Sequence, residues 1–226
     1  MLIKRIFDIL LSCILLFFLL PVFLFIILIL KNTGEGKVFF IQPRIGKGGK
    51  IVGVFKFVTM RENSESSGTI TTHGDTRVLP FGKFLRKTKI NELPQLMNVL
   101  LGSMSFVGPR PLVPETFNLY DEYIKDAISS VTPGVTGVGS TIFRNEEGLM
   151  KGLSNYQASE FYKHTIIPYK GELENWYVKH RTFLLDMRII ILTIQMTLFP
   201  NSKRTILSLG IPDAPDQLKA MLVKTK

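Results

Sequence analysis

The side chains that could do chemistry gather in one stretch, residues 83–111, with the sequence KFLRKTKINELPQLMNVLLGSMSFVGPRP. Its beginning is crowded with cations, which are Lys83, Arg86, Lys87 and Lys89. A carboxylate, Glu92, follows them, and Arg110 stands between two prolines at the end. Cations bind phosphate oxygens through charge-assisted hydrogen bonds, and a carboxylate can hold a divalent ion that bridges phosphates. The stretch therefore predicts a site for a phosphorylated ligand, although a basic run can also be a solvated helix face.

Residues 91–102 are expected to form a helix that begins beside Glu92. Asn91 is a favoured N-cap residue, and Pro94 is acceptable in a first turn whose backbone N–H groups have no partner. Apolar residues then recur at helical spacing until Gly102 ends the run. Glu92 is thus expected at the positive end of a helix dipole, which favours anions and a divalent ion bridging them. The alternative is that Glu92 only complements the dipole.

Arg110 lies in the sequence GPRP, residues 108–111, here named the GPRP segment. The residue before a proline is pushed towards extended geometry, so an arginine between two prolines has little backbone freedom. A guanidinium held in this way is prepared for two-point binding of a phosphate. A buried salt bridge is the other use of such an arginine.

The overall composition narrows the partner without naming it. The chain has 226 residues, 46% of them hydrophobic, which suits one domain with an appendage and a buried core. Its net charge of +10 fits nucleic acid, an anionic membrane face or phosphorylated small molecules, because a positive field attracts each of these polyanions. The single cysteine, Cys13, excludes an intramolecular disulfide, and the three histidines show no metal-ligand spacing.

The amino-terminal region selects a membrane among these partners. Residues 9–30 carry no charge, and 22 residues at about 1.5 Å each reach about 33 Å, close to the thickness of the hydrocarbon core of a bilayer. A cleaved signal peptide is the rival interpretation. The run is long for such a peptide, however, and no small-x-small cleavage site follows it.

Pro21 interrupts this apolar run in the middle and leaves two halves that are each too short to cross a bilayer. Lys4 and Arg5 precede the run while Lys31 and Lys37 follow it, so the distribution of positive charge does not separate the two ends. Equal charge at both ends fits a helix that dips into the membrane and returns. Because proline is also tolerated in spanning helices, these features alone leave both topologies open.

After the membrane segment, residues 38–45 and 51–60 are rich in Val, Ile and Phe and are joined by GKGG, which predicts a β-hairpin. This ribbon carries several cations that could meet lipid head groups or substrate phosphates, namely Arg44, Lys47, Lys50, Lys56 and Arg61. Of these we take Lys56 as a candidate phosphate-binding residue. Solvation at the strand edges is the alternative for most of these cations.

The remaining segments are expected to surround the site. Residues 61–77 lack a hydrophobic period and predict a mobile loop, which could close over a ligand or be a plain surface excursion. Residues 116–130 predict one helix. Residues 183–199 are apolar but contain charges, so they should lie at the membrane interface or in the protein core rather than span. Residues 201–226 form a basic tail.

Ten short motifs, taken together and in order, resemble the bacterial sugar transferase family, the monotopic phosphoglycosyl transferases. They are KRIFD (4–8), QPRIG (42–46), KFVTM (56–60), DTR (75–77), LRKT (85–88), NELPQL (91–96), SFVGPRP (105–111), TPGVTG (132–137), WYV (176–178) and FLLDMRIIILT (183–193). The resemblance covers about residues 2–199, which is more specific than any single motif. Members of this family move a sugar phosphate from a nucleotide sugar to a polyprenol phosphate.

The resemblance implies an architecture. The expected fold is a small mixed α/β domain, with a β-hairpin and several helices, on an amino-terminal re-entrant membrane helix. The expected regions are a proline-broken membrane helix at 1–31, a catalytic domain at 32–200 and the tail at 201–226. The catalytic domain would lie on the cytoplasmic face of the inner membrane.

The resemblance also implies the chemistry. The substrates would be a UDP-sugar and undecaprenyl phosphate, with UMP released and Mg²⁺ as the metal. Glu92 matches the glutamate of the family's catalytic acidic pair, which makes it a catalytic and metal-binding candidate. Arg110 matches a phosphate-binding arginine, and Arg86 matches a basic residue beside the site.

Asn91 departs from the family pattern, which has Asp-Glu where this chain has Asn91 and Glu92. The family's aspartate is thought to attack the β-phosphate and form a covalent phosphosugar intermediate. An amide is a far poorer nucleophile, and losing a nucleophile can cost on the order of a millionfold in rate. Three explanations stay open: Glu92 carries the chemistry, the lipid phosphate attacks directly while Asn91 orients it, or the protein is inactive.

Two other classes of function compete with an enzyme. A membrane-anchored scaffold or pseudoenzyme would keep the phosphate site without turnover. Binding of DNA is a weaker alternative, because the chain has a membrane run and no recognition-helix motif. We therefore expect no nucleic-acid partner. The sequence names neither the sugar nor the oligomeric state.

Overall fold

A computed structural model describes residues 2–33, 35–61, 77–144, 146–150, 152–199 and 209–219. Residues 62–76 of the predicted loop and most of the predicted tail therefore lie outside the described residues. The chain divides into two compact units. Unit 1 comprises Met1–Lys4, Arg44–Val52 and Ser103–Lys226, and unit 2 comprises Arg5–Pro43 and Gly53–Gly102. The three predicted regions stay a prediction, and each unit is described separately below.

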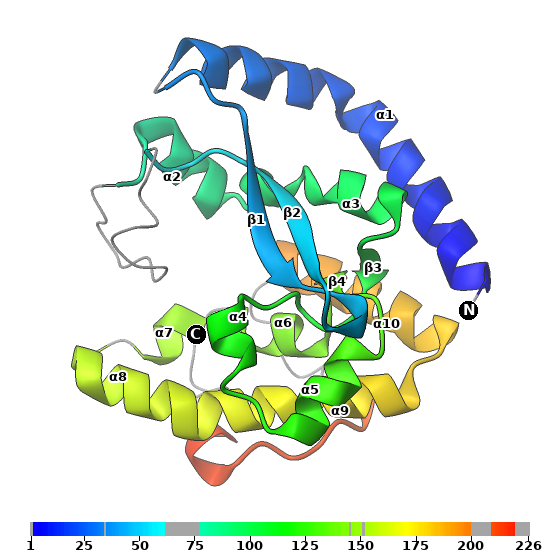
Figure 1. Cartoon of the computed structure of the whole chain (residues 1–226), viewed down its shortest axis with the longest axis vertical. Coiled ribbons are helices and arrows are strands. Elements are labelled where there is room, and N and C mark those ends of the chain that lie inside the picture. Colours follow the sequence, from blue (N-terminus) through cyan, green and yellow to red (C-terminus); the bar gives the residue numbers. More distant parts are fainter. Residues whose placement is uncertain are drawn as a thin grey trace. The chain divides into compact units, whose positions relative to one another are not determined.

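The apolar run forms one continuous helix, α1 (Leu2–Asn32), which contains Pro21 and is bowed in Figure 1. The core residues that α1 buries in unit 2, Phe23, Ile26 and Leu30, all follow Pro21. Much of the remaining apolar surface of α1 is exposed. Among the described residues, α1 is the helix that is long and apolar enough to cross a membrane by length and composition. Such a surface is unfavourable in water, so it suits contact with lipid.

Unit 2 packs the second half of α1 against a strand and a short helix. The hairpin forms as predicted, from β1 (Phe39–Ile45), a 3₁₀ turn η1 (Lys47–Gly49) and β2 (Ile51–Phe57). Its tip, Arg44–Val52, belongs to unit 1, and the rest of both strands belongs to unit 2. Phe57 at the end of β2 packs against Phe23 with ring centroids 5.3 Å apart. Leu85 of α2 (Pro80–Lys87) completes this core. The next elements are the 3₁₀ turn η3 (Ile90–Glu92) and α3 (Gln95–Leu101).

Unit 1 is built on two short parallel strands, β3 (Ser105–Val107) and β4 (Gly134–Thr136), in the register Ser105 to Gly134 and Val107 to Thr136. The connection between them contains α4 (Pro114–Phe117) and α5 (Glu122–Ser129). The single helix predicted over 116–130 is therefore wrong. The chain leaves the helical conformation before Asp121, which adopts extended geometry as the N-cap of α5.

Helices after β4 supply most of the core of unit 1. They are α6 (Val138–Ile142), α7 (Glu146–Leu149), α8 (Asn155–Phe161), the π-helical turn η4 (Tyr162–Ile166), α9 (Ile167–His180) and α10 (Phe183–Leu198). The largest buried cluster joins Val107 of β3 with Leu173 and Tyr177 of α9 and Ile189 of α10. The central position of α9 in this core lets its side chains reach the ends of both strands. This mixed helix and strand composition, with small sheets, confirms the predicted fold class.

Helix α10 has two apolar faces with different environments. One face buries Leu185, Ile189, Leu192 and Met196 in the core of unit 1. Another row is exposed and consists of Leu184, Ile191, Ile194 and Leu198. One face of α10 therefore lies in the protein core as predicted, and the exposed apolar row would suit the predicted membrane interface.

Candidate active site

Asn91 and Glu92 lie in the 3₁₀ turn η3 rather than at the start of an α-helix. Lys89 before the turn is left-handed (φ 61°), and the Glu92 N–H donates to the carbonyl oxygen of Lys89 at 3.1 Å. Helix α3 begins three residues later, with Pro94 as its N-cap. The predicted N-cap role of Asn91 and the free N–H at Glu92 are therefore wrong, because the tight turn uses that N–H itself. Gly102 ends α3 as predicted, with φ 89°.

The amide of Asn91 is unusually placed for a polar group. Its Oδ1 is buried and accepts no hydrogen bond from any described group. A buried unpaired carbonyl costs about 1–3 kcal/mol, and such an atom calls for a bound water or ion. The neighbouring carboxylate of Glu92 is half-buried. Two oxygen donors of the kind that Mg²⁺ prefers thus stand next to each other in the chain.

These donors fit an ion that arrives with its substrate better than an ion in a preformed cage. In the described part of the chain, no group of three or more His, Cys, Asp and Glu side chains gathers to hold a metal. Mg²⁺ commonly uses one or two protein oxygens and completes its shell with water and substrate phosphates. Asn91 and Glu92 could hold it in that way, and the magnesium site stays a prediction.

The other candidate residues of unit 2 are Arg86 and Lys56. Arg86 is half-buried in the last turn of α2, the element directly before the turn that contains Glu92. Lys56 lies on β2, and its Nζ donates to Oε1 of Gln42 on β1 at 2.8 Å. Both are therefore in the same unit as Asn91 and Glu92, while their contact with phosphate stays a prediction.

Two polar side chains hold α3 in place within unit 2. The Asn98 side chain accepts from the Phe55 N–H at 2.9 Å and donates to the Gly53 carbonyl oxygen at 2.7 Å, so it fastens α3 to β2. Arg5 donates to the carbonyl oxygens of Val99 and Leu100 at 2.6 and 2.8 Å, at the carboxyl end of α3, where the helix dipole favours a cation. These contacts anchor the helix that follows Glu92.

The GPRP segment lies in unit 1, directly after β3, and interleaves with the sequence TPGVTG. The Gly108 N–H donates to Thr136 at 3.0 Å, and the Gly134 N–H donates to Pro109 at 2.8 Å. A Cβ built on Gly134 would lie only 2.1 Å from the Gly108 nitrogen, so this approach requires glycine. The prolines on both sides of Arg110 are buried and Arg110 itself is exposed. The arginine thus stands exposed between two buried prolines, and its rigidity and its role stay predictions.

A small pocket of unit 1 lies beside this arginine. It is lined by Ile45, Gly46, Pro109, Arg110, Leu112, Phe117, Ile128, Ser129 and Pro133. Arg44 precedes the lining residue Ile45 in the chain. Its side chain donates to the carbonyl oxygen of Pro111 at 3.1 Å and so binds the backbone of the GPRP segment. The walls are mostly apolar, so a polar group of a ligand would meet chiefly the arginine.

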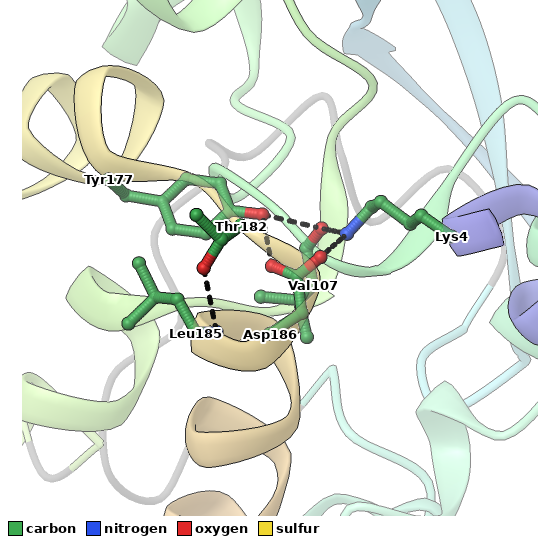
Figure 2. Close-up of polar contacts among 6 residues, drawn as sticks. All are labelled: Lys4, Val107, Tyr177, Thr182, Leu185 and Asp186. Atoms are coloured by element: carbon green, nitrogen blue, oxygen red, sulfur yellow. Dashed lines mark hydrogen bonds and ion pairs between the residues drawn. The ribbon is translucent and has the colours of Figure 1, made fainter. Parts of the chain in front are cut away.

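Lys4, in the first turn of α1, belongs to unit 1 and enters a buried polar network there (Figure 2). Its Nζ lies 2.5 Å from Oδ2 of Asp186 and donates to the Val107 carbonyl oxygen at 2.9 Å. Tyr177 donates to Oδ1 of the same carboxylate at 2.7 Å. Burial and the neighbouring Asp186 carboxylate raise the pKa of Tyr177, which keeps its phenol protonated. Tyr177 is thus a core residue with a buried polar tip.

Glu174 is a buried carboxyl that the sequence motifs did not indicate. It lies on α9, and its Oε2 has no described hydrogen-bond partner. Burial raises the pKa of Glu174 to about 7, although the Lys170 ammonium and the Arg110 backbone N–H pull it down. A signal was available in the sequence, since a lone glutamate between Leu173 and Tyr177 stands on an otherwise core-facing stripe. Its importance depends on neighbours that are distant in sequence.

The candidate residues are therefore divided between the units. Asn91, Glu92, Arg86 and Lys56 lie in unit 2, and Arg110 lies in unit 1. A common site made by both sets stays a prediction.

Comparison with known proteins identifies the family. A family model described as bacterial sugar transferase matches residues 1–200. The chain belongs to the bacterial sugar transferase family. The resemblance inferred from its motifs is confirmed, and so is the predicted enzyme class, a phosphoglycosyl transferase, at the level of the family.

Three relatives illustrate the match. The "Uncharacterized sugar transferase EpsL" of Bacillus subtilis is 36% identical over 199 residues, covering 88% of each chain. The UDP-glucose:undecaprenyl-phosphate glucose-1-phosphate transferase of Xanthomonas campestris is 36% identical over 84% of this chain. An N-acetylgalactosaminephosphotransferase of Aeromonas hydrophila, named for UDP-N-acetylgalactosamine and undecaprenyl phosphate, is 34% identical over 87% of this chain. The match spans 37% and 44% of the lengths of the second and third relatives.

Proposed function

We propose that the protein transfers a sugar-1-phosphate from a UDP-sugar to undecaprenyl phosphate and releases UMP, as the first step of a surface polysaccharide or glycoconjugate. The observation that carries this proposal is the family match over residues 1–200. Relatives named for glucose-1-phosphate and for N-acetylgalactosamine phosphate transfer to undecaprenyl phosphate support the reaction type. Because these names differ in the sugar, they leave the sugar open.

In the proposed reaction, a phosphate oxygen of the lipid forms a bond to the β-phosphorus of the UDP-sugar. The bond from that phosphorus to the bridging oxygen breaks, and UMP leaves with the electron pair. Charge on the two phosphates must be neutralised for this attack, and Mg²⁺ bound at Glu92 would supply part of the neutralisation. The Arg110 guanidinium would hold a phosphate in place, with Arg86 and Lys56 adding positive charge.

Asn91 favours direct transfer over a covalent route through residue 91. Its amide oxygen can accept a hydrogen bond or touch a cation, whereas its nitrogen is a poor nucleophile. The burial of Oδ1 without a described partner supports a positioning role beside Glu92. In this proposal Asn91 orients a reacting group, and Glu92 holds the metal and the charge.

The membrane supplies one substrate, so location is part of the function. Association with a membrane follows from the exposed apolar surface of α1 and from the family. We propose in addition that α1 is re-entrant, with both ends on the cytoplasmic face of the inner membrane. The interruption at Pro21 and the cations at both ends of the helix support this topology.

The test uses the full chain in lipid nanodiscs, with undecaprenyl phosphate and a panel of UDP-sugars. UMP release and the lipid-linked product are measured with and without Mg²⁺. We expect one or a few sugars to give both products, and Glu92→Gln to abolish them while Glu122→Gln, an exposed glutamate on α5, does not. Absence of UMP with every sugar would contradict the proposal and favour the scaffold or pseudoenzyme alternative.

A further inference from the structure

Part of the predicted tail is packed into the core of unit 1. The side chain of Leu218 is 0% exposed and belongs to the largest buried cluster of this unit. Further apolar residues of the same segment pack against that cluster, namely Leu209, Ile211 and Ala214. Figure 1 shows this segment in red, running along α9. We name residues 209–219 the clasp, and it lies beyond the family match, which ends at residue 200.

The sequence of the clasp explains how it turns its apolar side chains inward. Ile211 and Ala214 each precede a proline, which favours an extended backbone over a helical one. One helical turn follows Pro215, in which the N–H groups of Leu218 and Lys219 donate to the Pro215 carbonyl oxygen at 2.8 and 2.9 Å. Several polar side chains between the apolar ones are exposed, and they are Asp213, Asp216 and Gln217. The clasp is therefore an amphipathic segment rather than a uniformly polar tail.

A hydrogen bond joins the clasp to α9. The hydroxyl of Tyr169 donates to the Pro212 carbonyl oxygen at 2.9 Å. Burial and the Asp213 carboxylate raise the pKa of Tyr169 to about 12, so its phenol keeps the proton that this bond needs. The Tyr169 ring is buried and packs edge-on against Phe143, with ring centroids 6.0 Å apart. Tyr169 thus contacts the clasp through its hydroxyl and the residue after α6 through its ring.

Phe143 in turn contacts the pair of charges at the start of α7. The Lys170 ammonium lies 5.3 Å from the centre of the Phe143 ring and donates to both carboxylate oxygens of Glu146, at 2.7 and 2.8 Å. Glu146 is the first residue of α7. A cation over an aromatic ring and a partly buried ion pair both stabilise only in a well-defined geometry. A continuous series of contacts therefore leads from the clasp through Tyr169 to α7.

We propose that the clasp is an integral part of the folded domain and a positioning element, which fixes Tyr169 and thereby Phe143. Without the clasp, apolar side chains of the core cluster would be exposed to water, which is unfavourable. Pro212 and Pro215 restrict the segment before it docks, which reduces the conformational entropy lost on docking. This role follows from the contacts and does not depend on the reaction that the protein catalyses.

The first test measures amide hydrogen exchange in the full chain in lipid nanodiscs, without substrate. The amides of Leu218 and Lys219 should exchange at least about tenfold more slowly than in an unfolded chain, because docking protects their hydrogen bonds. Leu218→Ala should remove this protection, whereas Gln217→Ala, at the exposed neighbouring position, should keep it. Unprotected amides at 218 and 219 in the wild type would overturn the proposal, and so would equal exchange in the two variants.

The same experiment tests whether the effect of the clasp reaches Phe143. The Phe143 N–H donates to the Gly139 carbonyl oxygen at 2.9 Å. Leu218→Ala should speed exchange of this amide at least about threefold, and Gln217→Ala should leave it unchanged. A loss of protection that stays within the clasp would overturn the positioning role.

Tyr169→Phe separates the hydrogen bond from the packing, because the ring stays and only the hydroxyl is lost. We expect the amides of Leu218 and Lys219 to exchange about fivefold faster in this variant, the effect of one lost hydrogen bond. Tyr156→Phe, at an exposed tyrosine of α8, is the matched control and should match the wild type. Wild-type exchange in Tyr169→Phe would show that this bond does not secure the clasp and would contradict the proposal.

Thermal melting of the detergent-solubilised full chain tests whether the clasp is integral to the fold. Leu218→Ala should lower the melting temperature by about 5–10 °C, as expected for a large-to-small change in the core of a chain of this size. Gln217→Ala should melt with the wild type. Equal melting temperatures for Leu218→Ala and the wild type would refute the proposal. A Leu218→Ala chain that does not fold would support it, and Tyr169→Phe then serves in the exchange test at Phe143.

Discussion

The ammonium of Lys4 lies 2.5 Å from the carboxylate of Asp186, although 182 residues separate them in sequence. Asp186 is 1% exposed, whereas the Lys4 side chain is 16% exposed and has a path to water. The two partners should therefore respond differently to mutation. A carboxylate that loses its cation stays buried and charged, while a lysine that loses its carboxylate can turn outward.

We expect Lys4→Met to lower the free energy of unfolding by about 3–5 kcal/mol, the range for breaking a buried ion pair by removing one partner. Asp186→Asn should cost less, because the amide keeps a partner in Tyr177 and the lysine can reach water. Melting temperatures of the detergent-solubilised full chain measure both. Lys179→Met, at an exposed site on α9, is the control. Equal losses in Lys4→Met and Asp186→Asn would contradict this asymmetry.

Gly134→Ala should disrupt the interleaved segments that carry Arg110. The new methyl group would meet the Gly108 nitrogen at 2.1 Å and the Thr136 carbonyl oxygen at 2.4 Å, and backbone cannot turn aside as a side chain can. We expect a loss of at least about 3 kcal/mol, at the upper end of overpacking costs. The comparison is Gly152→Ala, where nothing lies within 4 Å and the left-handed φ of 89° costs about 1–2 kcal/mol. Thermal melting measures both variants. Equal melting temperatures for Gly134→Ala and Gly152→Ala would contradict the predicted clash.

Glu174 should make stability depend on pH between about 4.5 and 7. Burial raises its pKa to about 7 from an ordinary 4.5, so the folded protein holds this proton more tightly than the unfolded chain does. That contribution is complete below pH 4.5 and is lost as pH rises to 7. The free energy of unfolding of the wild type should thus fall relative to Glu174→Gln by about 3 kcal/mol over this window. Denaturant titrations at several pH values measure the difference, and parallel curves for the two proteins would rule out the shift.

Asn91→Asp should change the route of the reaction. A carboxylate at 91 supplies the nucleophile that an amide lacks, so the variant should release UMP from a UDP-sugar without lipid acceptor and form a phosphosugar adduct. Intact-protein mass spectrometry detects this adduct. The wild type should show none, and Asn118→Asp, at a position just after α4, should resemble the wild type. An adduct on the wild-type chain would show that direct transfer is the wrong mechanism.

Local features were predictable because short-range forces decide them. The apolar residues 9–30 suffice for a long helix, GKGG between two β-rich runs suffices for a hairpin, and Gly102 ends α3 because it tolerates a left-handed conformation. The ten motifs, taken in order, also sufficed to indicate the family. Prediction failed where two local conformations compete closely, as in the 3₁₀ turn at Glu92 and the break before α5.

The sequence alone thus determined the long apolar helix, the hairpin, the family and the placing of an arginine between two prolines. The tertiary structure decided which distant groups lie together: Lys4 with Asp186, Gly108 with Gly134, and Gly139 with Glu174. The physical reason is burial. The free-energy effect of a buried charge or a glycine depends on the atoms packed around it. Those atoms come from distant segments, which spacing and periodicity along the chain do not identify.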